Sequence, residues 1–209
     1  MDPLIEEVVE ALRGIGWQVE PAATARALPA AVAARHPNLP PLALAFFTGI
    51  ESCVSDDEGR WLLAAADYGT PAGSDGFAWD EFERMFADDP EDEREKVRIH
   101  AFWDKYLPIF QLVSGDYEYL AIGTDPGSDQ FGKIVWGDVI DYDQPTVVAS
   151  SYESFLEQVR DVASRVPTRS AVYDNDLTRL IHTDIIEDGV APPWEGWWAR
   201  LRRRLRGGN

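Results

Sequence analysis

Cysteine is nearly absent from this chain of 209 residues, in which Cys53 stands alone. A single cysteine cannot form an intramolecular disulfide, so the sequence excludes a small secreted domain stabilised by disulfide bonds. None of the three histidines lies in a His-Glu-x-x-His pattern, and Cys53 has no second thiol beside it for a structural zinc site. We therefore expect no metal ion and no cofactor.

Basic residues are also scarce. The chain has 19 lysines and arginines against 37 aspartates and glutamates, which gives a net charge of −18. Nucleic-acid binding depends on phosphate contacts with a basic face, so we expect no nucleic-acid partner. A protein of this charge attracts basic partners instead.

Long apolar runs are missing as well. The longest covers about residues 39–47, far short of the roughly 18 residues that a membrane-spanning helix needs. Met1-Asp2-Pro3 and the acidic residues that follow lack the positive and apolar regions of a signal peptide. We expect a cytoplasmic protein without a transmembrane segment, and the excess of arginine over lysine is typical of a GC-rich bacterial genome.

The sequence does contain ample material for a hydrophobic core. Apolar residues make up 45% of the chain, including 8 tryptophans, 7 tyrosines and 9 phenylalanines. This composition excludes a disordered chain. Periodic apolar positions predict helices at both ends of the main body and strands between them. The expected helices cover residues 3–13, 29–35, 41–50, 89–106 and 151–162, and the expected strands cover 60–66, 109–113, 117–122, 133–136 and 147–149.

This order of elements favours an α+β fold over repeated βαβ units. We expect a single domain with a mostly antiparallel sheet of about six strands flanked by helices. An N-terminal helix occupies residues 1–24, the main domain residues 25–166, and a C-terminal extension residues 167–209.

Motifs that suggest chemistry are incomplete. Residues 127–133 match the first seven positions of a phosphate-binding loop, but Ile134 replaces the required serine or threonine and a strand follows instead of a helix. Asp125, Gly127 and Asp129 resemble a calcium loop, yet Gly127 and Gln130 occupy positions where that loop needs other residues. A hairpin turn explains both patterns better.

Two further chemical hypotheses are weak. The side chains of His182, Asp184 and Glu187 can in principle share a metal ion, although short polar spacing near a helix end explains them equally well. Carboxylates are too numerous for any pair of them to identify a carboxylate-based hydrolase. We expect no catalytic residues, and the hydrolase stays an alternative.

Two acidic segments are the first distinctive feature of the chain. They support two hypotheses, a solvated surface or a docking face for a basic partner. The candidate partner-binding residues are Asp56, Asp57, Glu58, Asp88, Asp89, Glu91, Asp92 and Glu93.

The second distinctive feature is the tail, residues 193–209, in which tryptophans and leucines share one helical face and arginines cover the rest. Five arginines and one glutamate give the tail a charge of +4, so residues 1–192 carry −22. Three hypotheses stay open: a terminal helix docked on the domain, a membrane-surface helix, or self-association with the acidic segments of another copy. The candidate interaction residues are Trp194, Trp197, Trp198, Arg202 and Arg203.

A series of short motifs runs through residues 25–165. It comprises Leu39-Pro40-Pro41 with Phe46-Phe47, Arg60-Trp61-Leu62-Leu63, Asp67-Tyr68, the segment 77–83, Phe102-Trp103, Leu107-Pro108-Ile109, the segments 115–122 and 132–137, and the closing segment 147–156. In this order the motifs resemble the SUKH superfamily, which unites fungal Smi/Knr-like cell-wall regulators with many bacterial immunity proteins.

The resemblance implies an α+β fold and a non-enzymatic role in protein–protein interaction. Bacterial members resemble immunity proteins that neutralise a toxin, often a nuclease, and the family has no catalytic residues to transfer. We expect the partner to be a basic toxin domain that is blocked by occlusion, with a regulatory or scaffold protein of the Smi/Knr type as the alternative. Gly115-Asp116 is expected to form a turn, and Trp79 and Trp103 to lie in the core.

Overall fold

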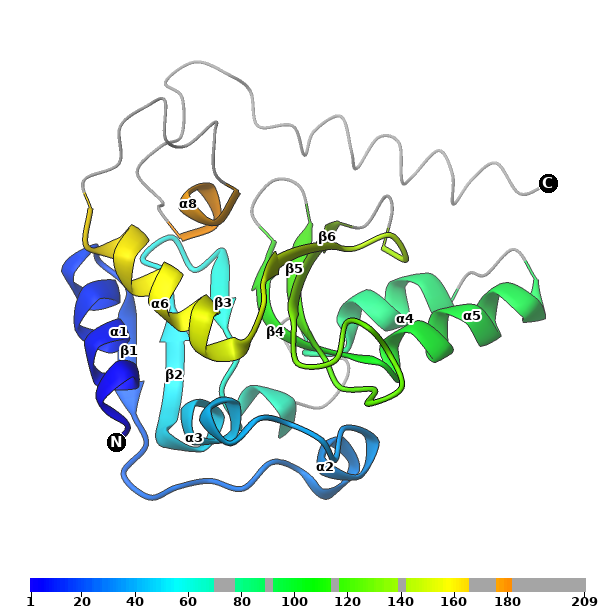
Figure 1. The fold of residues 1–209 in the computed structure, drawn as a ribbon, viewed down its shortest axis with the longest axis horizontal. Coiled ribbons are helices and arrows are strands. Elements are labelled where there is room, and N and C mark those ends of the chain that lie inside the picture. The colour runs from blue at the N-terminus through cyan, green and yellow to red at the C-terminus, as the bar shows by residue number, and fades with distance from the viewer. Residues whose placement is uncertain (70–77, 89–91, 114–116, 139–141, 166–175, 182–209) are drawn as a thin grey trace, which may run out of the picture.

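The computed structural model describes residues 1–69, 78–88, 92–113, 117–138, 142–165 and 176–181 (Figure 1). Helices and strands alternate irregularly along the chain, and one short 3-10 turn lies at Asp67–Gly69. The helices are α1 (Pro3–Gly14), α2 (Ala30–Arg35), α3 (Pro41–Gly49), α4 (Glu81–Ala87), α5 (Glu93–Trp103), α6 (Tyr152–Ala163) and α8 (Asp176–Ile181). The strands are β1 (Gln18–Pro21), β2 (Ile50–Val54), β3 (Arg60–Leu62), β4 (Tyr106–Leu112), β5 (Glu118–Gly123), β6 (Ile134–Asp138) and β7 (Thr146–Ala149).

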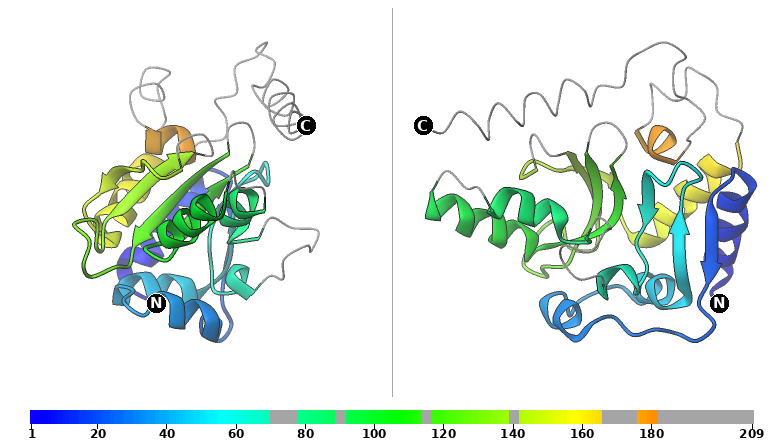
Figure 2. Two further views of the ribbon diagram at one scale, coloured as in Figure 1. Left: turned by 90° about the vertical axis from the view of Figure 1, so that its right-hand side faces the viewer. Right: turned by 180° about the vertical axis from the view of Figure 1, so that it is seen from behind.

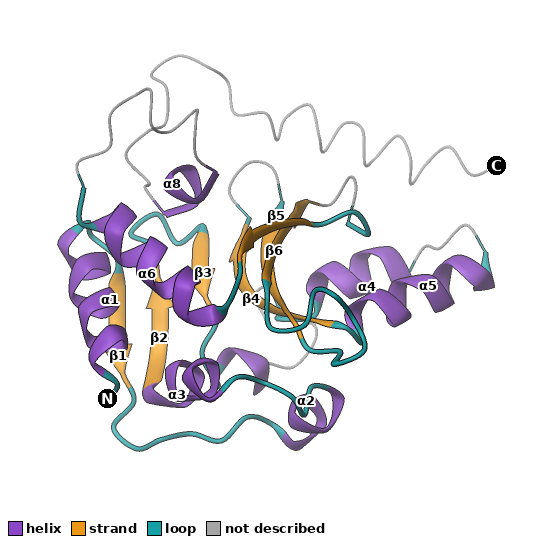
Figure 3. Cartoon of the chain, in the orientation of Figure 1, coloured by secondary structure: helices purple, strands orange, loops and turns teal. Residues whose placement is uncertain are grey.

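The strands form one seven-stranded sheet in the order β1-β2-β3-β4-β5-β6-β7. Each strand pairs antiparallel with the next one along the chain. The α+β class with an antiparallel sheet is therefore confirmed, and the sheet has one strand more than the six expected. Figure 3 shows the helices gathered around these strands.

Several expected elements have different bounds. The sequence analysis missed β1, β2 and α4, and the strand expected over 60–66 ends at Leu62. The helix expected over 89–106 is α5, which ends at Trp103, and β4 begins three residues later. Pro108 lies inside β4, where the register with β5 shifts between Pro108 and Phe110, so an irregularity accommodates the proline. The turn expected at Gly115-Asp116 lies outside the described residues.

One face of the sheet carries the main core, which we define as the buried apolar residues shared by the sheet and helices α1, α3, α6 and α8. The carboxylate of Asp2 accepts a hydrogen bond from the Leu4 amide at 2.9 Å and so caps α1. Ser151 caps α6 in the same way through the Ser154 amide. These local signals start two amphipathic helices that pack side by side over the sheet (Figure 1).

The other face carries a second apolar group, which we call the aromatic cluster. In β5, Leu120 and Ile122 join the main core, whereas Tyr119 and Ala121 join the aromatic cluster, as the alternation of a strand requires. Helices α4 and α5 cover this cluster (Figure 2). Its members are Phe82, Ala87, Ile99, Trp103, Tyr106, Tyr119, Ala121 and Val135, with Phe86, Phe102, Tyr117 and Tyr142 half-buried against them.

The core residues expected from the motifs lie inside the molecule to different degrees. Trp103 is 2% exposed and contacts the ring of Tyr119 edge-on, which confirms its expected place in the core. Trp79 is half-buried and packs against the main core beside Tyr68. Gly137 lies beneath the Tyr119 hydroxyl, and a Cβ atom there would collide with it.

Both ends of the described chain are integrated into the main core. Residues 1–24 supply α1 and also the edge strand β1, and the Arg13 side chain donates to the Val19 carbonyl on that edge. The Trp17 indole donates to the Ile181 carbonyl at 2.9 Å, which ties α8 to the start of β1. Residues 182–209, with the tryptophan–arginine tail, lie outside the described residues. Nowhere in the described ranges is there a helix with the length and apolar character that crossing a membrane requires.

Candidate functional site

The acidic residues singled out in the sequence fall into two separate groups. Asp56, Asp57 and Glu58 form the turn between β2 and β3, whereas Asp88, Asp92 and Glu93 lie where α4 ends and α5 begins. All six are exposed, and Asp89 and Glu91 lie outside the described residues. The turn is on the half of the molecule that holds α1, and the start of α5 is at the other end of the longest axis (Figure 1). The two segments do not form one acidic face.

Some of these carboxylates have local structural roles. Asp57 accepts hydrogen bonds from the Ser55 hydroxyl and the Gly59 amide and pairs with Arg60. Partial burial opposes ionisation of Asp57, but the Ser55 hydrogen bond and the charge of Arg60 hold its pKa below the ordinary value. Asp92 caps α5 by accepting a hydrogen bond from the Glu95 amide. Asp57 and Asp92 therefore stabilise a turn and a helix start.

A group of charges that the sequence analysis did not predict connects α2, α4 and α5. We call it the Glu83 cluster, and it consists of Arg35, Glu83, His100 and Asp104. The Arg35 guanidinium donates two hydrogen bonds to the Glu83 carboxylate at 2.6 and 2.8 Å and a third to Asp104 at 2.8 Å. The Nδ1 atom of His100 lies 2.6 Å from the same carboxylate. Glu83 is only 7% exposed, so its charge is balanced inside the protein.

A buried histidine adjoins this cluster. His36 is 1% exposed, and its Nδ1 atom lies 2.9 Å from the Thr124 hydroxyl at the start of the β5–β6 loop. The direction of this hydrogen bond depends on which ring nitrogen of His36 carries the proton, and Nε2 has no hydrogen-bond partner among the described residues. Burial, aided by the charge of Arg35, lowers the pKa of His36 to about 4, so the ring is neutral at pH 7.

The Glu83 cluster is suited to holding elements together. The Glu83 carboxylate accepts two hydrogen bonds from Arg35 and contacts His100. These contacts orient the side chains and join α2, α4 and α5. The sequence contains one faint sign of it, since His100 and Asp104 are four residues apart at the end of a helix and share a face. Nothing in the sequence indicates that Arg35 and Glu83 would join them.

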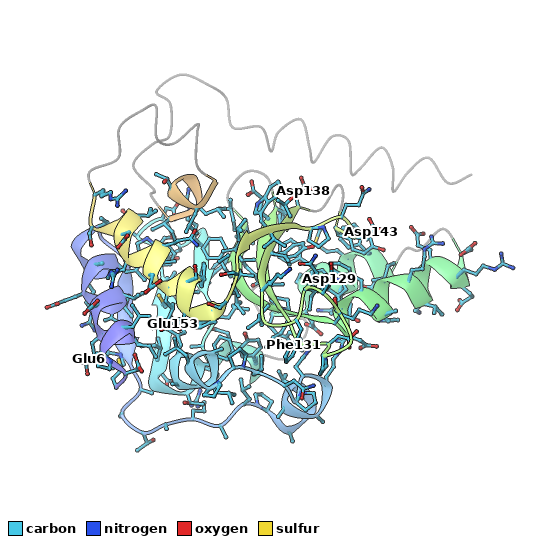
Figure 4. All side chains as sticks on the ribbon, in the orientation of Figure 1. Glu6, Asp129, Phe131, Asp138, Asp143 and Glu153 are labelled. Atoms are coloured by element: carbon cyan, nitrogen blue, oxygen red, sulfur yellow. The ribbon has the colours of Figure 1, made fainter. Side chains whose placement is uncertain are left out.

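Charge on the described surface is unbalanced. Six arginines form ion pairs with carboxylates in the described ranges, whereas many exposed carboxylates have no such pair. On α1 and α6 these unpaired residues include Glu10, Glu153 and Glu157 (Figure 4 labels Glu153). The paired arginines are Arg26, Arg35, Arg60, Arg84, Arg160 and Arg165.

The residues of both incomplete motifs, 125–133, lie in the hairpin connection between β5 and β6, which confirms the turn hypothesis. A strand follows Lys133, so the phosphate-binding arrangement is not formed. Asp125 accepts a hydrogen bond from the Gly127 amide at 2.9 Å, as in a tight turn. In the part of the chain that the structure describes, no three histidine, cysteine or acidic side chains are grouped to hold a metal ion. His182, Asp184, Glu187 and the tail residues lie beyond that part.

Two comparisons of the sequence with known proteins find no match. The chain matches no protein-family model and no curated protein sequence. The SUKH assignment therefore stays a prediction from the ordered motifs.

Proposed function

We propose that this protein is a non-enzymatic binding module that neutralises a basic toxin domain by covering it. The observation that carries the proposal is the charge imbalance of the described surface, where exposed carboxylates without an ion pair, such as Glu10 and Glu153, outnumber exposed basic residues without one, such as Arg94. Unpaired surface carboxylates leave a strong negative field around the molecule. That field attracts a basic protein and repels nucleic acid.

A nuclease toxin is the kind of partner that this field suits. A nuclease must contact phosphates, so its active cleft is basic. An inhibitor with net charge −18 approaches such a cleft faster than diffusion alone permits, and it opposes the negatively charged substrate. The motif resemblance to bacterial immunity proteins adds support, and the α+β fold agrees with it. The proposal places the protein in the bacterial cytoplasm, where such a toxin would act.

Co-expression tests this proposal directly. Each gene beside the one for this chain is expressed in a bacterial host with and without the chain. We expect one product to stop growth and co-expression of this chain to restore it. If every neighbouring product is harmless, or if the chain rescues none of them, the proposal is wrong. Isolation of housekeeping partners instead would favour a regulatory scaffold.

Salt dependence tests the electrostatic part. With the rescued toxin as the partner, the association rate should fall steeply as ionic strength rises, because salt shortens the screening length to about 10 Å at 0.1 M. A triple variant, Glu10→Gln, Glu153→Gln and Glu157→Gln, should associate more slowly at low salt and equally fast at high salt. An association rate that is independent of salt would contradict steering.

A further inference from the structure

The two edges of the sheet differ in how well they are protected against pairing with another strand. The edge strands are β1 and β7, and each has four residues and pairs with one described neighbour. The outer side of an edge strand presents a row of backbone N–H and C=O groups to which a further strand can bind. Since the two strands are equally short, the difference between the edges lies in their residues.

The β1 edge is blocked. Pro21 has no amide hydrogen to donate, and the Arg13 side chain already donates to the Val19 carbonyl, at 3.1 Å from Nε. Glu20, between them, is exposed and charged. Proline, charge and a covered backbone are the devices by which natural edge strands avoid pairing with other chains.

The β7 edge has none of these devices among the described residues. Thr146–Ala149 contains no proline and no charged side chain, and its first three residues are β-branched, which favours an extended chain. Thr146 is exposed, and Val147 is 42% exposed. In the described ranges β7 pairs with β6 alone, and no printed side-chain hydrogen bond reaches its backbone. The outer backbone groups of β7 are therefore arranged to pair with one more strand.

Charge indicates which chain can supply that strand. A second copy of this protein also carries −18, so two copies repel each other. Exposed carboxylates lie on both sides of β7 along the chain, Asp143 before it and Glu153 after it (Figure 4). Lys133, next to the β6 residue that pairs with Ala149, is half-buried and offsets only part of this charge. A segment with basic side chains therefore fits this edge better than another copy does.

We propose that β7 is the docking strand of the partner-binding surface, to which an extended basic segment of the toxin domain adds as a further strand. This inference rests on the proposed function, because it assigns the binding surface for the same partner. Backbone hydrogen bonds give the affinity in this mode of recognition, and the exposed side chains of Thr146 and Val147 contact alternate residues of the added strand. The surface lies on β7 and not on the two acidic segments.

Amide hydrogen exchange tests the added strand directly. The probe is the toxic product that this chain neutralises, purified as a catalytically inactive variant. In the complex, outward amides of Thr146–Ala149 should exchange at least about 10-fold more slowly than in the free chain, because they gain hydrogen bonds. The amides of β1 are the internal control and should keep their rates. Unchanged exchange in β7 would overturn the proposal.

A charge on the edge tests the same surface through affinity. Val147→Lys should weaken binding by at least about 10-fold, because a lysine on an edge strand opposes pairing and repels a basic segment. Gln18→Lys is the matched control, since it adds the same charge at an exposed position of β1. That variant should bind within about twofold of the wild-type chain. Val147→Thr keeps a β-branched side chain of similar size and should bind as the wild type does.

The outcomes separate the two proposals. If the wild-type chain binds no neighbouring product, the proposed function fails and this inference fails with it. If the chain binds but Val147→Lys and Gln18→Lys bind equally well, the function stands and the β7 surface is wrong. A free chain that is dimeric in analytical ultracentrifugation, with its β7 amides already protected, would assign the edge to a second copy instead.

Discussion

The two faces of the sheet are covered by helices of different character. On one face, α1 and α6 bury regular apolar stripes in the main core and begin at side-chain caps. On the other, α4 and α5 pack against rings from β4 and β5, and the Glu83 cluster fastens them to α2. The first arrangement depends on signals within each helix, and the second on residues distant in the chain. Their stabilities should therefore respond to different perturbations.

The largest effects should come from removing a core ring on either face. Phe155 in the main core and Phe82 in the aromatic cluster are both fully buried. Replacing either with alanine should cost about 3–5 kcal/mol of unfolding free energy, because it removes buried contacts and leaves a cavity. Denaturant unfolding followed by circular dichroism and tryptophan fluorescence measures both losses.

The same measurement decides whether the faces fold together. Strands β4 to β6 lie between the two groups, so each variant should show a single transition with both probes coincident. An early separate transition in Phe82→Ala would mean that α4 and α5 unfold independently of the main core.

Acid should lower the unfolding free energy of the protein through His36, which adjoins the Glu83 cluster. The unfolded chain protonates this ring near pH 6.5 and the folded chain only near pH 4. The unfolded state thus binds more protons between these values, and stability must fall as the pH decreases through this window. The contribution is complete above pH 6.5, and its loss amounts to about 3 kcal/mol by pH 4.

A His36→Asn variant isolates this contribution. Its stability should lack the component that titrates between pH 6.5 and 4, while the carboxylates still titrate in both proteins. Parallel curves of unfolding free energy against pH for the two proteins would show that His36 is not the group responsible.

The smallest effects on stability are expected from substitutions in the Glu83 cluster. Glu83→Gln leaves the Arg35 charge without its buried partner and should cost about 2 kcal/mol. The side chain of Asp104 is 61% exposed, so Asp104→Asn should change stability by less than about 0.5 kcal/mol. Thermal unfolding at pH 7 compares them, and equal effects would mean that burial does not distinguish the two carboxylates.

The accuracy of the sequence analysis follows the same division. The stripes and caps of α1 and α6 predicted both helices, because apolar spacing and an N-cap act within a few residues. The hairpin between β5 and β6 was predicted from its turn residues. Helix α4 was missed, since Glu81–Ala87 is short and its buried Phe82 and Glu83 are stabilised by distant partners.

The candidate surfaces were harder to predict than the fold. The described residues of the acidic segments lie on the exterior, yet the separation of the two segments along the molecule has no sign in the sequence. The sequence alone does not distinguish the exposed Phe131 from the buried and half-buried aromatic residues. The exposed fraction of a side chain depends on which other segments pack against it, and the loop that carries the residue does not determine this.

The sequence by itself determined the charge of the protein, its class of fold and the helices with strong periodicity. These properties depend on composition and on the fixed geometry of a helix or strand. Tertiary structure alone decided that Arg35 and Glu83, 48 residues apart, form a partly buried ion pair and that Phe131 stays exposed. Contacts across such distances form only when separate elements pack, because no local regularity of the chain links them.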